Sequence, residues 1–429
     1  MSDATITILF VLFAILFFVS EIIPLAVTAM LLSAGLALTG VLPAKDAFAG
    51  FVDSNVWLFM AMFIIGAAIF ETGMAKRIGG YVTRFAKTES HLIIALMLIT
   101  GLMSGLLSNT GTAAVLIPMV LGIAQKTGFN KKRLLLPLVI AAAMGGNLSL
   151  IGAPGNLIAQ AGLQQMGLSF GFFEFAKVGL PILGVGILYF VFFGQKLLPN
   201  TTSEDVAKGD SINFFDQEQD ESCESRWKQN VAFFVLVLTV LAMVFEKKLG
   251  VPLFVSAWAG ALILIVSGVI SENSAMRSID MKTIMLFVGS LSLAVALNKS
   301  GAGEIIAGGM INLMGSDPSP FIVLLVVFLV AVVLTNFMSN TATTALLVPI
   351  CLAIAEQLQA DPKAVLMATV IGGSLAYATP IGMPANTMIY GIGNYRFMDY
   401  VKVGLPLIVL AMVVALVLLP IIFPFFPNH

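Results

Sequence analysis

Long apolar runs follow one another along this chain with hardly a charged residue inside them. They include residues 5–20, 24–42, 56–72, 134–151 and 405–422. Each run is about as long as a helix that crosses a lipid bilayer. Because 59% of all residues are hydrophobic and only 10% are charged, no large soluble domain remains. The sequence therefore predicts an all-α polytopic membrane protein embedded in a lipid bilayer.

Several other classes of protein are disfavoured. The first apolar run is followed directly by others, and residues 20–24 contain no small-residue cleavage site, so we expect a retained span rather than a signal peptide. The two cysteines, Cys223 and Cys351, lie in a polar segment and an apolar segment, which argues against a disulfide framework or a thiolate metal site. The net charge of −1 indicates no nucleic-acid partner.

A polar phrase occurs twice in these apolar surroundings. SNTGTAAVLIP begins at Ser108 and SNTATTALLVP begins at Ser339, and seven of the eleven positions are identical. Ser, Asn and Thr side chains in hydrocarbon are costly unless their polar groups find partners. The duplication therefore predicts a paired binding site.

The whole chain reads as two copies of one pattern. At an offset near 228 residues, Pro24 corresponds to Pro252 and Gly73 corresponds to Gly301, and small insertions shift the offset further along the chain. Eight of the 23 acidic residues lie in the stretch 200–228, which we interpret as a solvated cytoplasmic linker. The predicted repeats are residues 1–199 and 229–429.

The orientation of the repeats depends on residues 91–125. The arms 91–107 and 111–125 are short for a full crossing, and the turn between them is the uncharged Ser-Asn-Thr triplet. A re-entrant hairpin fits this pattern, because irregular backbone at membrane depth persists only where protein or a cavity satisfies it. Each repeat then has five transmembrane helices, so the second repeat must be inverted, as in many transporters.

The basic residues test this topology independently. If the loop after the third span is cytoplasmic, all but six of the 22 Lys and Arg residues lie inside. The six outside are Lys45, Lys177, Lys247, Lys248, Lys299 and Lys363. This bias follows the positive-inside rule and predicts a plasma (inner) membrane protein with both termini outside. We expect segments 74–88 and 302–316 to form surface helices after the third span of each repeat.

A second polar pattern follows each hairpin. It reads GGNLSLIGAPGN from Gly145 to Asn156, and GGSLAYATPIGMPAN from Gly372 to Asn386. The Gly and Pro residues interrupt a helix that would otherwise cross smoothly, which frees carbonyl and amide groups near the membrane centre. The alternative is a proline kink that serves packing alone.

These four phrases offer hydroxyls, amide oxygens and free carbonyls, which are neutral oxygen ligands suited to an alkali cation. Helix N-termini and Asn or Thr donors suit an anion. None of the four phrases contains Asp, Glu, Lys, Arg or His, so a proton relay has no evident carrier. The pattern favours sodium coupling over proton coupling.

Together, the paired Ser-Asn-Thr phrases, the Gly-x-Pro-x-Asn phrases and the inverted repeat resemble the divalent-anion:sodium symporter family, which carries dicarboxylates, citrate or sulfate. The resemblance covers essentially the whole chain. It implies a homodimer in which a transport domain moves as an elevator against a scaffold. The scaffold would comprise 1–88 and 229–318, and the transport domain 89–199 and 319–429.

The resemblance also implies site residues. The first sodium site would use Ser104, Ser108, Asn109 and the backbone at Gly152, and the second would use Thr335, Ser339, Asn340 and the backbone at Gly382. Ser104 and Thr335 each precede a triplet serine by four residues, which would place the two hydroxyls one helical turn apart. The expected substrate contacts are Asn109, Thr110, Asn340, Thr341, Pro384, Asn156 and Asn386. No cofactor is expected besides sodium as the coupling ion.

The substrate is the least determined part of this interpretation. Dicarboxylate carriers of the family typically read Thr-Pro-Pro-Asn in the broken helices, whereas this chain has Ala153-Pro154-Gly155-Asn156 and Met383-Pro384-Ala385-Asn386. A C4-dicarboxylate is the first expectation because both Ser-Asn-Thr triplets are intact, and sulfate or another oxyanion is the second.

Two other functions are weighed against sodium-driven import. A proton-coupled exchanger or permease on a related fold would be expected to carry a carboxylate in the broken helices, and the sequence has none there. A membrane enzyme would need a catalytic set, but the two histidines, His91 and His429, belong to no zinc or Ser-His motif. The sequence therefore predicts a transporter and not an enzyme.

Overall fold

The computed structural model describes residues 1–80, 88–199, 225–315 and 318–426. Within these ranges the regular secondary structure is helical throughout. Seven of the described helices are long and apolar enough to cross a membrane, and several shorter apolar helices accompany them. Residues 200–224 of the predicted linker lie outside the described residues. So do residues 81–87 of the first predicted surface helix.

The two halves repeat the same order of helices. The main helices of the first half are α1 (Asp3–Ser20), α2 (Leu25–Leu38), α4 (Ser54–Glu71), α5 (Met74–Gly80), α6 (Glu89–Ser104), α7 (Asn109–Thr127), α8 (Lys131–Gly145), α9 (Pro154–Gln165) and α10 (Ala176–Tyr189). Those of the second half are α13 (Arg226–Val244), α15 (Leu253–Val266), α17 (Met281–Ser300), α18 (Ala302–Met314), α19 (Pro320–Phe337), α20 (Asn340–Gln357), α21 (Pro362–Gly373), α22 (Pro384–Ile392) and α23 (Phe397–Ile422).

Matching residues end matching helices. Gly73 follows α4 and Gly301 follows α17, and their φ angles of 71° and 74° lie in the left-handed region that favours glycine. Proline stands in the first turn of both α9 and α22, where its missing N–H is not needed. The repeat is therefore encoded in helix ends as well as in the apolar pattern.

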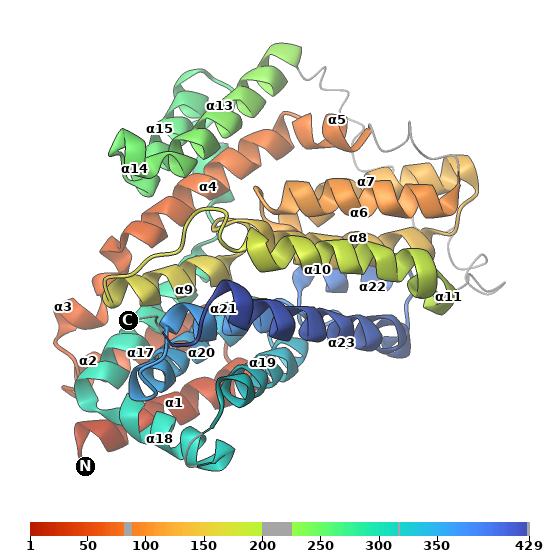
Figure 1. The fold of residues 1–429 in the computed structure, drawn as a ribbon. Helices are drawn as coiled ribbons and strands as arrows, with labels where there is room; N and C mark the ends of the chain where they lie inside the picture. The colour runs from red at the N-terminus through yellow and green to blue at the C-terminus, as the bar shows by residue number, and fades with distance from the viewer. Residues whose placement is uncertain (81–87, 200–224, 316–317, 427–429) are drawn as a thin grey trace.

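Equivalent helices pack in equivalent ways. In one group α2 packs against α17 and α15 packs against α4, which is the same pairing made twice across the repeats. In the other group α6 packs on α8, α19 packs on α21, and the equivalent helices α10 and α23 pack on each other. Figure 1 shows α13, α15 and α4 together, apart from α6, α8 and α10.

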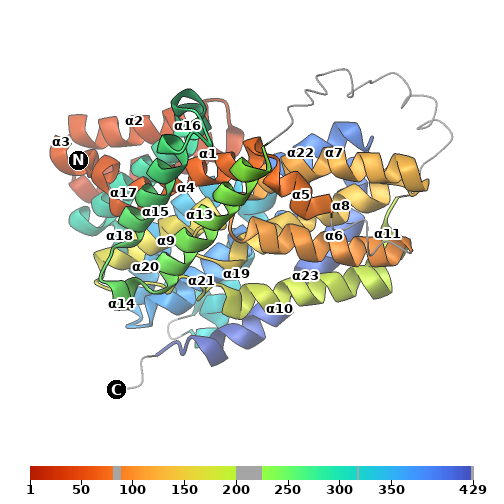
Figure 2. The ribbon, with the colours of Figure 1, turned by 90° about the horizontal axis from the view of Figure 1, so that it is seen from above.

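Each predicted hairpin and each broken helix is present. The first hairpin is α6 and α7, the second is α19 and α20, and breaks separate α8 from α9 and α21 from α22. From their tips, α7 extends toward one end of the molecule and α20 toward the opposite end, in both views (Figures 1 and 2). This arrangement confirms the predicted fold class of two inverted repeats.

Candidate functional site

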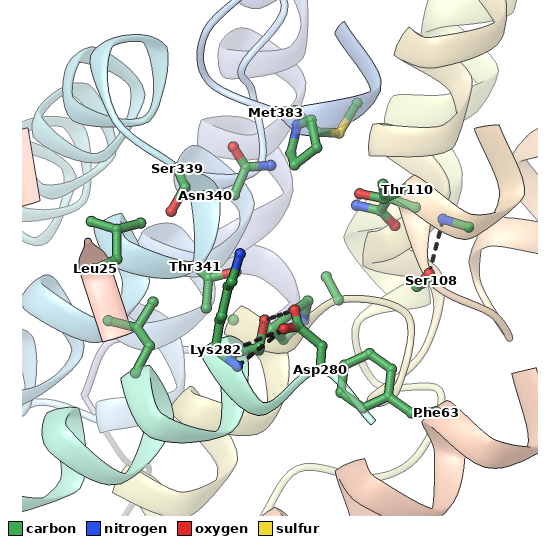
Figure 3. A pocket seen from close by; sticks show the side chains of 18 of the residues that line it. Leu25, Phe63, Ser108, Thr110, Asp280, Lys282, Ser339, Asn340, Thr341 and Met383 are labelled. Carbon is green, nitrogen blue, oxygen red and sulfur yellow. Dashed lines mark hydrogen bonds between the residues drawn. The ribbon is translucent and has the colours of Figure 1, made fainter. Parts of the chain in front are cut away.

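The two hairpin tips meet across one cavity of about 830 Å³. Both Ser-Asn-Thr triplets line it, with Ser108 and Thr110 on one side and Ser339, Asn340 and Thr341 on the other (Figure 3). The breaks of the two discontinuous helices supply further wall, through residues 153–155 and 382–384. Segments that lie more than two hundred residues apart in sequence thus form one site.

Four helices of the hairpins and broken helices begin at this cavity. They are α7, α9, α20 and α22, whose first residues Asn109, Pro154, Asn340 and Pro384 all line it. Ser108 caps α7 by accepting from the Gly111 N–H at 3.0 Å, and Ser339 caps α20 by accepting from the Ala342 N–H at 3.2 Å. The N-caps of α9 and α22 make no side-chain hydrogen bond. Helix N-termini carry partial positive charge, so their convergence favours an anion.

The first oxygen cluster lies behind the tip of the first hairpin. Ser104 Oγ donates to the Ala142 carbonyl at 2.6 Å. The carboxamide atom of Asn109 that points into the cluster lies 2.8 Å from Ser104 Oγ, 3.0 Å from the Gly152 carbonyl oxygen and 3.2 Å from the Ala142 carbonyl oxygen. With nitrogen at that position, Asn109 donates to all three oxygens. With oxygen there, it accepts from Ser104 Oγ, and four oxygens converge at a point where a cation would stabilise them.

The second cluster repeats part of this geometry in the other hairpin. Thr335 Oγ1 donates to Asn340 Oδ1 at 2.7 Å and also lies against the Gly373 carbonyl. Thr335 is fully buried, as is Ser104 in the first cluster. The structure thus brings together two pairs from the expected sodium ligands, Ser104 with Asn109 and Thr335 with Asn340, while Ser108 and Ser339 cap α7 and α20 instead. The two clusters present neutral oxygens of the kind that suit an alkali cation.

Close backbone approach explains the glycines of these clusters. An added Cβ on Gly152 would lie 2.5 Å from the Gly146 carbonyl oxygen, and one on Gly382 would lie 2.2 Å from the Thr335 carbonyl oxygen. The Gly146 carbonyl lies at the break after α8 and the Thr335 carbonyl lies near the end of α19, so neither can move without shifting those segments. Glycine is required here because the carbonyl-bearing backbones must come together.

One geometric expectation is wrong. The spacing of four residues predicted that Ser104 and Ser108, like Thr335 and Ser339, lie one helical turn apart. Instead α6 ends at Ser104 and α19 ends at Phe337, so each triplet serine lies beyond its helix and caps the next one. The turn that reverses each hairpin decides this, and the spacing alone does not show it.

Asn156 and Asn386 occupy a different place from the one expected of substrate contacts. Both side chains are buried behind the cavity wall. Asn156 Nδ2 donates to the carbonyls of Gly146 at 2.9 Å and Ser149 at 2.7 Å. Asn386 Nδ2 donates to those of Ala376 at 2.7 Å and Thr379 at 3.0 Å. These amides tie together the two sides of each helix break.

The sequence reasoning missed Ser149 and Thr379, which stand seven residues before these asparagines. The Ser149 hydroxyl donates to the Gly105 carbonyl, and the Thr379 hydroxyl donates to the Asn336 carbonyl at 2.6 Å. Each bond fastens a broken helix to the end of its hairpin arm. Their equal spacing within the two quoted phrases is the signal that could have identified them.

Gly155, one of the departures from the family pattern, lies where there is no room for a larger residue. Gly155 stands where dicarboxylate carriers typically have the second proline of Thr-Pro-Pro-Asn. An added Cβ at Gly155 would lie 2.6 Å from Oγ1 of Thr344, which also lines the cavity. The space that a larger residue would fill is occupied by a side chain of the opposite hairpin.

Helix α17 adds residues that the motifs did not indicate. The residues at and before its start that line the cavity are Ser278, Asp280, Lys282 and Thr283. The Asp280 carboxylate caps α17 by accepting from the Lys282 N–H at 3.1 Å and the Thr283 hydroxyl at 2.5 Å. Nothing in the local sequence distinguishes these residues from ordinary helix-capping residues.

The donor set limits the chemistry of the site. Across the described ranges, no group of three or more His, Cys, Asp or Glu side chains is placed to hold a metal ion. What the cavity offers is neutral oxygens for alkali cations and helix N-termini with amide and hydroxyl donors for an anion.

The family comparison agrees with this chemistry. A family model described as a citrate transporter matches residues 15–372 and 340–428. An uncharacterized transporter of Haemophilus influenzae is 29% identical, over 94% of this chain and 88% of its own length. Sodium-dependent high-affinity dicarboxylate transporter 3 of Caenorhabditis elegans is 25% identical over 90% of this chain and 78% of its own length. The sodium-dependent dicarboxylate transporter SdcS of Staphylococcus saprophyticus is 24% identical, over 94% and 84%.

Solved structures share the fold. The YdaH transporter of Alcanivorax borkumensis superposes with a TM-score of 0.66 at 16% identity, and the match covers 97% of each chain. MtrF of Neisseria gonorrhoeae superposes with a TM-score of 0.64 at 14% identity, covering 92% of this chain and 86% of that one. At these identities the likeness concerns the fold alone.

Proposed function

Because this chain belongs to the citrate transporter family, we propose that it is a secondary active transporter that imports a small divalent anion by sodium symport. The first-choice substrate is a C4-dicarboxylate. The observation that carries the proposal is the meeting of the two Ser-Asn-Thr tips across one cavity, each with a neutral oxygen cluster behind it. Two cations would flank one anion, and their charges would offset those of a dicarboxylate.

The proposed sodium ligands follow from the two clusters. Ser104, Ser108, Asn109 and the Gly152 carbonyl would hold one ion. Thr335, Ser339, Asn340 and the backbone at Gly382 would hold the other. Two relatives are named sodium-dependent dicarboxylate transporters, which supports sodium as the coupling ion. Because both Asn109 and Asn340 link a cluster to the cavity, each could couple ion binding to substrate binding.

The proposed substrate contacts are Asn109, Thr110, Asn340, Thr341 and the turn at Pro384, which all line the cavity. The N-termini of α9 and α22 have no side-chain cap. The N–H groups of Asn156 and Asn386 donate to the Ala153 and Met383 carbonyls, which leaves the N–H groups of Gly155 and Ala385 in the first turn for an anion. Asn156 and Asn386 would act indirectly, by holding the turns that present these groups.

Two alternatives remain part of the proposal's test. Sulfate or another oxyanion would suit the same helix N-termini. A proton-coupled carrier would need a titrating group at the site, and Asp280 is the one carboxylate among the described cavity-lining residues. Its oxygens already accept from the start of α17, which gives it an evident capping role.

Transport would proceed by an elevator motion. The moving part would be 89–199 with 319–429, which contains both hairpins and both broken helices. The scaffold would be 1–88 with 229–318, including the paired helices α2, α17, α4 and α15. We further propose a homodimer in the plasma membrane, with both termini outside. Cysteine crosslinking between a hairpin tip and α17, with and without sodium, would report the motion.

Uptake into proteoliposomes tests the function directly. Succinate uptake is expected to require an inward sodium gradient and to be lost in Asn109→Ala and Asn340→Ala. Asn312→Ala is the matched control, because Asn312 is exposed on α18 and does not line the cavity. Uptake driven equally by a pH gradient without sodium would overturn the symport proposal. Normal uptake in either tip variant would overturn the site.

A further inference from the structure

Only two charged residues line the central cavity in the described parts of the chain, and both come from the start of α17. They are Asp280 and Lys282. The other described lining residues are apolar or carry neutral hydroxyl or amide groups. Lys282 is therefore the one positively charged side chain among the described residues of a cavity that suits an anion.

The two charges are not paired with each other. Asp280 is engaged by the backbone N–H groups of Lys282 and Thr283 and by the Thr283 hydroxyl. The Lys282 ammonium has no ion pair in the described structure, although three other pairs of opposite charge are formed there. Figure 3 shows its side chain extending from α17 into the cavity, on the side of Asn340 and Thr341.

Lys282 comes from a helix that lies outside both hairpins. It lies in the first turn of α17, which packs against α2 and also against α20, the helix that begins with Asn340 and Thr341. An anion held at the tips would therefore have the Lys282 ammonium beside it, on the side of the second tip. The helix N-termini can neutralise one end of such an anion, and Lys282 can neutralise the other.

We propose that Lys282 is a substrate-contacting residue that selects dianions over monoanions by binding the second carboxylate. This inference rests on the proposed function. The Lys282 ammonium donates to an oxygen of the second carboxylate and forms an ion pair with it, which the neutral side chains of the tips cannot do. Since Lys282 is exposed, water screens part of this attraction, so its contribution lies at the low end for a charged hydrogen bond.

Two ligands distinguish direct binding of the second carboxylate by Lys282 from a general attraction of Lys282 for any anion. Succinate carries two carboxylates, and succinamate has the same carbon chain with one carboxylate replaced by a neutral amide. In saturating sodium, thermal-shift titration of purified protein measures the apparent Kd of each ligand. Lys282→Gln is expected to raise the Kd for succinate by roughly tenfold. The Kd for succinamate is expected to stay unchanged.

Two further variants keep the inference falsifiable. Lys282→Arg retains the charge and is expected to retain the preference for succinate. Lys299→Gln is the matched control, because Lys299 lies at the opposite end of α17 and pairs with Asp46 at 2.6 Å, away from the cavity.

The outcomes are distinct. If the wild type binds succinate with sodium and Lys282→Gln binds it equally well, the inference is overturned. Equal losses for succinate and succinamate would also overturn it, since selection by charge would then be absent. If the wild type binds no dianion in sodium, the proposed function itself fails.

Discussion

The Ser374 hydroxyl donates a hydrogen bond to Oδ1 of Asn147 at 3.0 Å, across 227 positions of sequence. Asn147 lies at the break after α8, and Ser374 lies at the end of α21, so the bond joins the two broken helices. Both side chains are buried, and Ser374 also lines the cavity. The two halves of the site are therefore linked directly as well as through a shared cavity.

Removing this link should lower stability by more than the loss of an ordinary hydroxyl. Ser374→Ala leaves the buried Asn147 amide oxygen without its donor, and we expect a cost of about 1–2 kcal/mol. A double-mutant cycle with Asn147→Ala, followed by thermal unfolding in detergent, measures the coupling. Ser267→Ala is the control, because Ser267 bonds only to the Leu264 carbonyl of its own helix. Additive effects of the two substitutions would contradict the link.

The glycine at the second cluster should be intolerant of any side chain. In Gly382→Ala the new Cβ would lie 2.2 Å from the Thr335 carbonyl oxygen, so the cluster must distort. Sodium-dependent uptake and sodium-dependent thermal stabilisation are both expected to be lost. Gly391→Ala is the control in the neighbouring α22, because nothing lies within 4 Å of its new Cβ. An unchanged sodium response in Gly382→Ala would argue against a site there.

The Thr335 hydroxyl should set sodium affinity through its contacts with Asn340 and Gly373. We expect Thr335→Val to raise the sodium concentration for half-maximal uptake by about tenfold. Thr335→Ser keeps the hydroxyl and should keep most of the sodium affinity. Sodium titration of succinate uptake makes the comparison. If the serine variant loses as much sodium affinity as the valine variant, the hydroxyl by itself does not set that affinity, and the prediction is contradicted.

The Asn386 side chain should matter for stability rather than for substrate choice. Asn386→Ala leaves the Ala376 and Thr379 carbonyls without the amide that joins them, at a cost of about 1–3 kcal/mol. In the protein that remains folded, the ranking of succinate, malate, citrate and sulfate as competitors of uptake is expected to be unchanged. A changed ranking with normal thermal stability would instead restore the direct substrate contact expected from the sequence.

The order and type of the elements followed from the sequence because their causes are local. Apolar runs of bilayer length, the cost of an unpartnered Ser-Asn-Thr triplet and the proline at each break all act within a few turns of helix. The predicted hairpin arms 91–107 and 111–125 accordingly match α6 (Glu89–Ser104) and α7 (Asn109–Thr127). Comparing one repeat with the other added information, because each motif had a second copy to test it.

The sequence by itself thus determined a helical membrane protein of two inverted repeats, and it identified the polar phrases that converge. Only the tertiary structure decided which way each polar side chain faces. The side chains of Asn156 and Asn386 point toward the helix breaks, because the free carbonyls there need hydrogen-bond donors. The tertiary structure also placed Lys282 in the cavity wall, beside the start of α20. That position depends on how α17 packs against the rest of the molecule, and no local pattern records it.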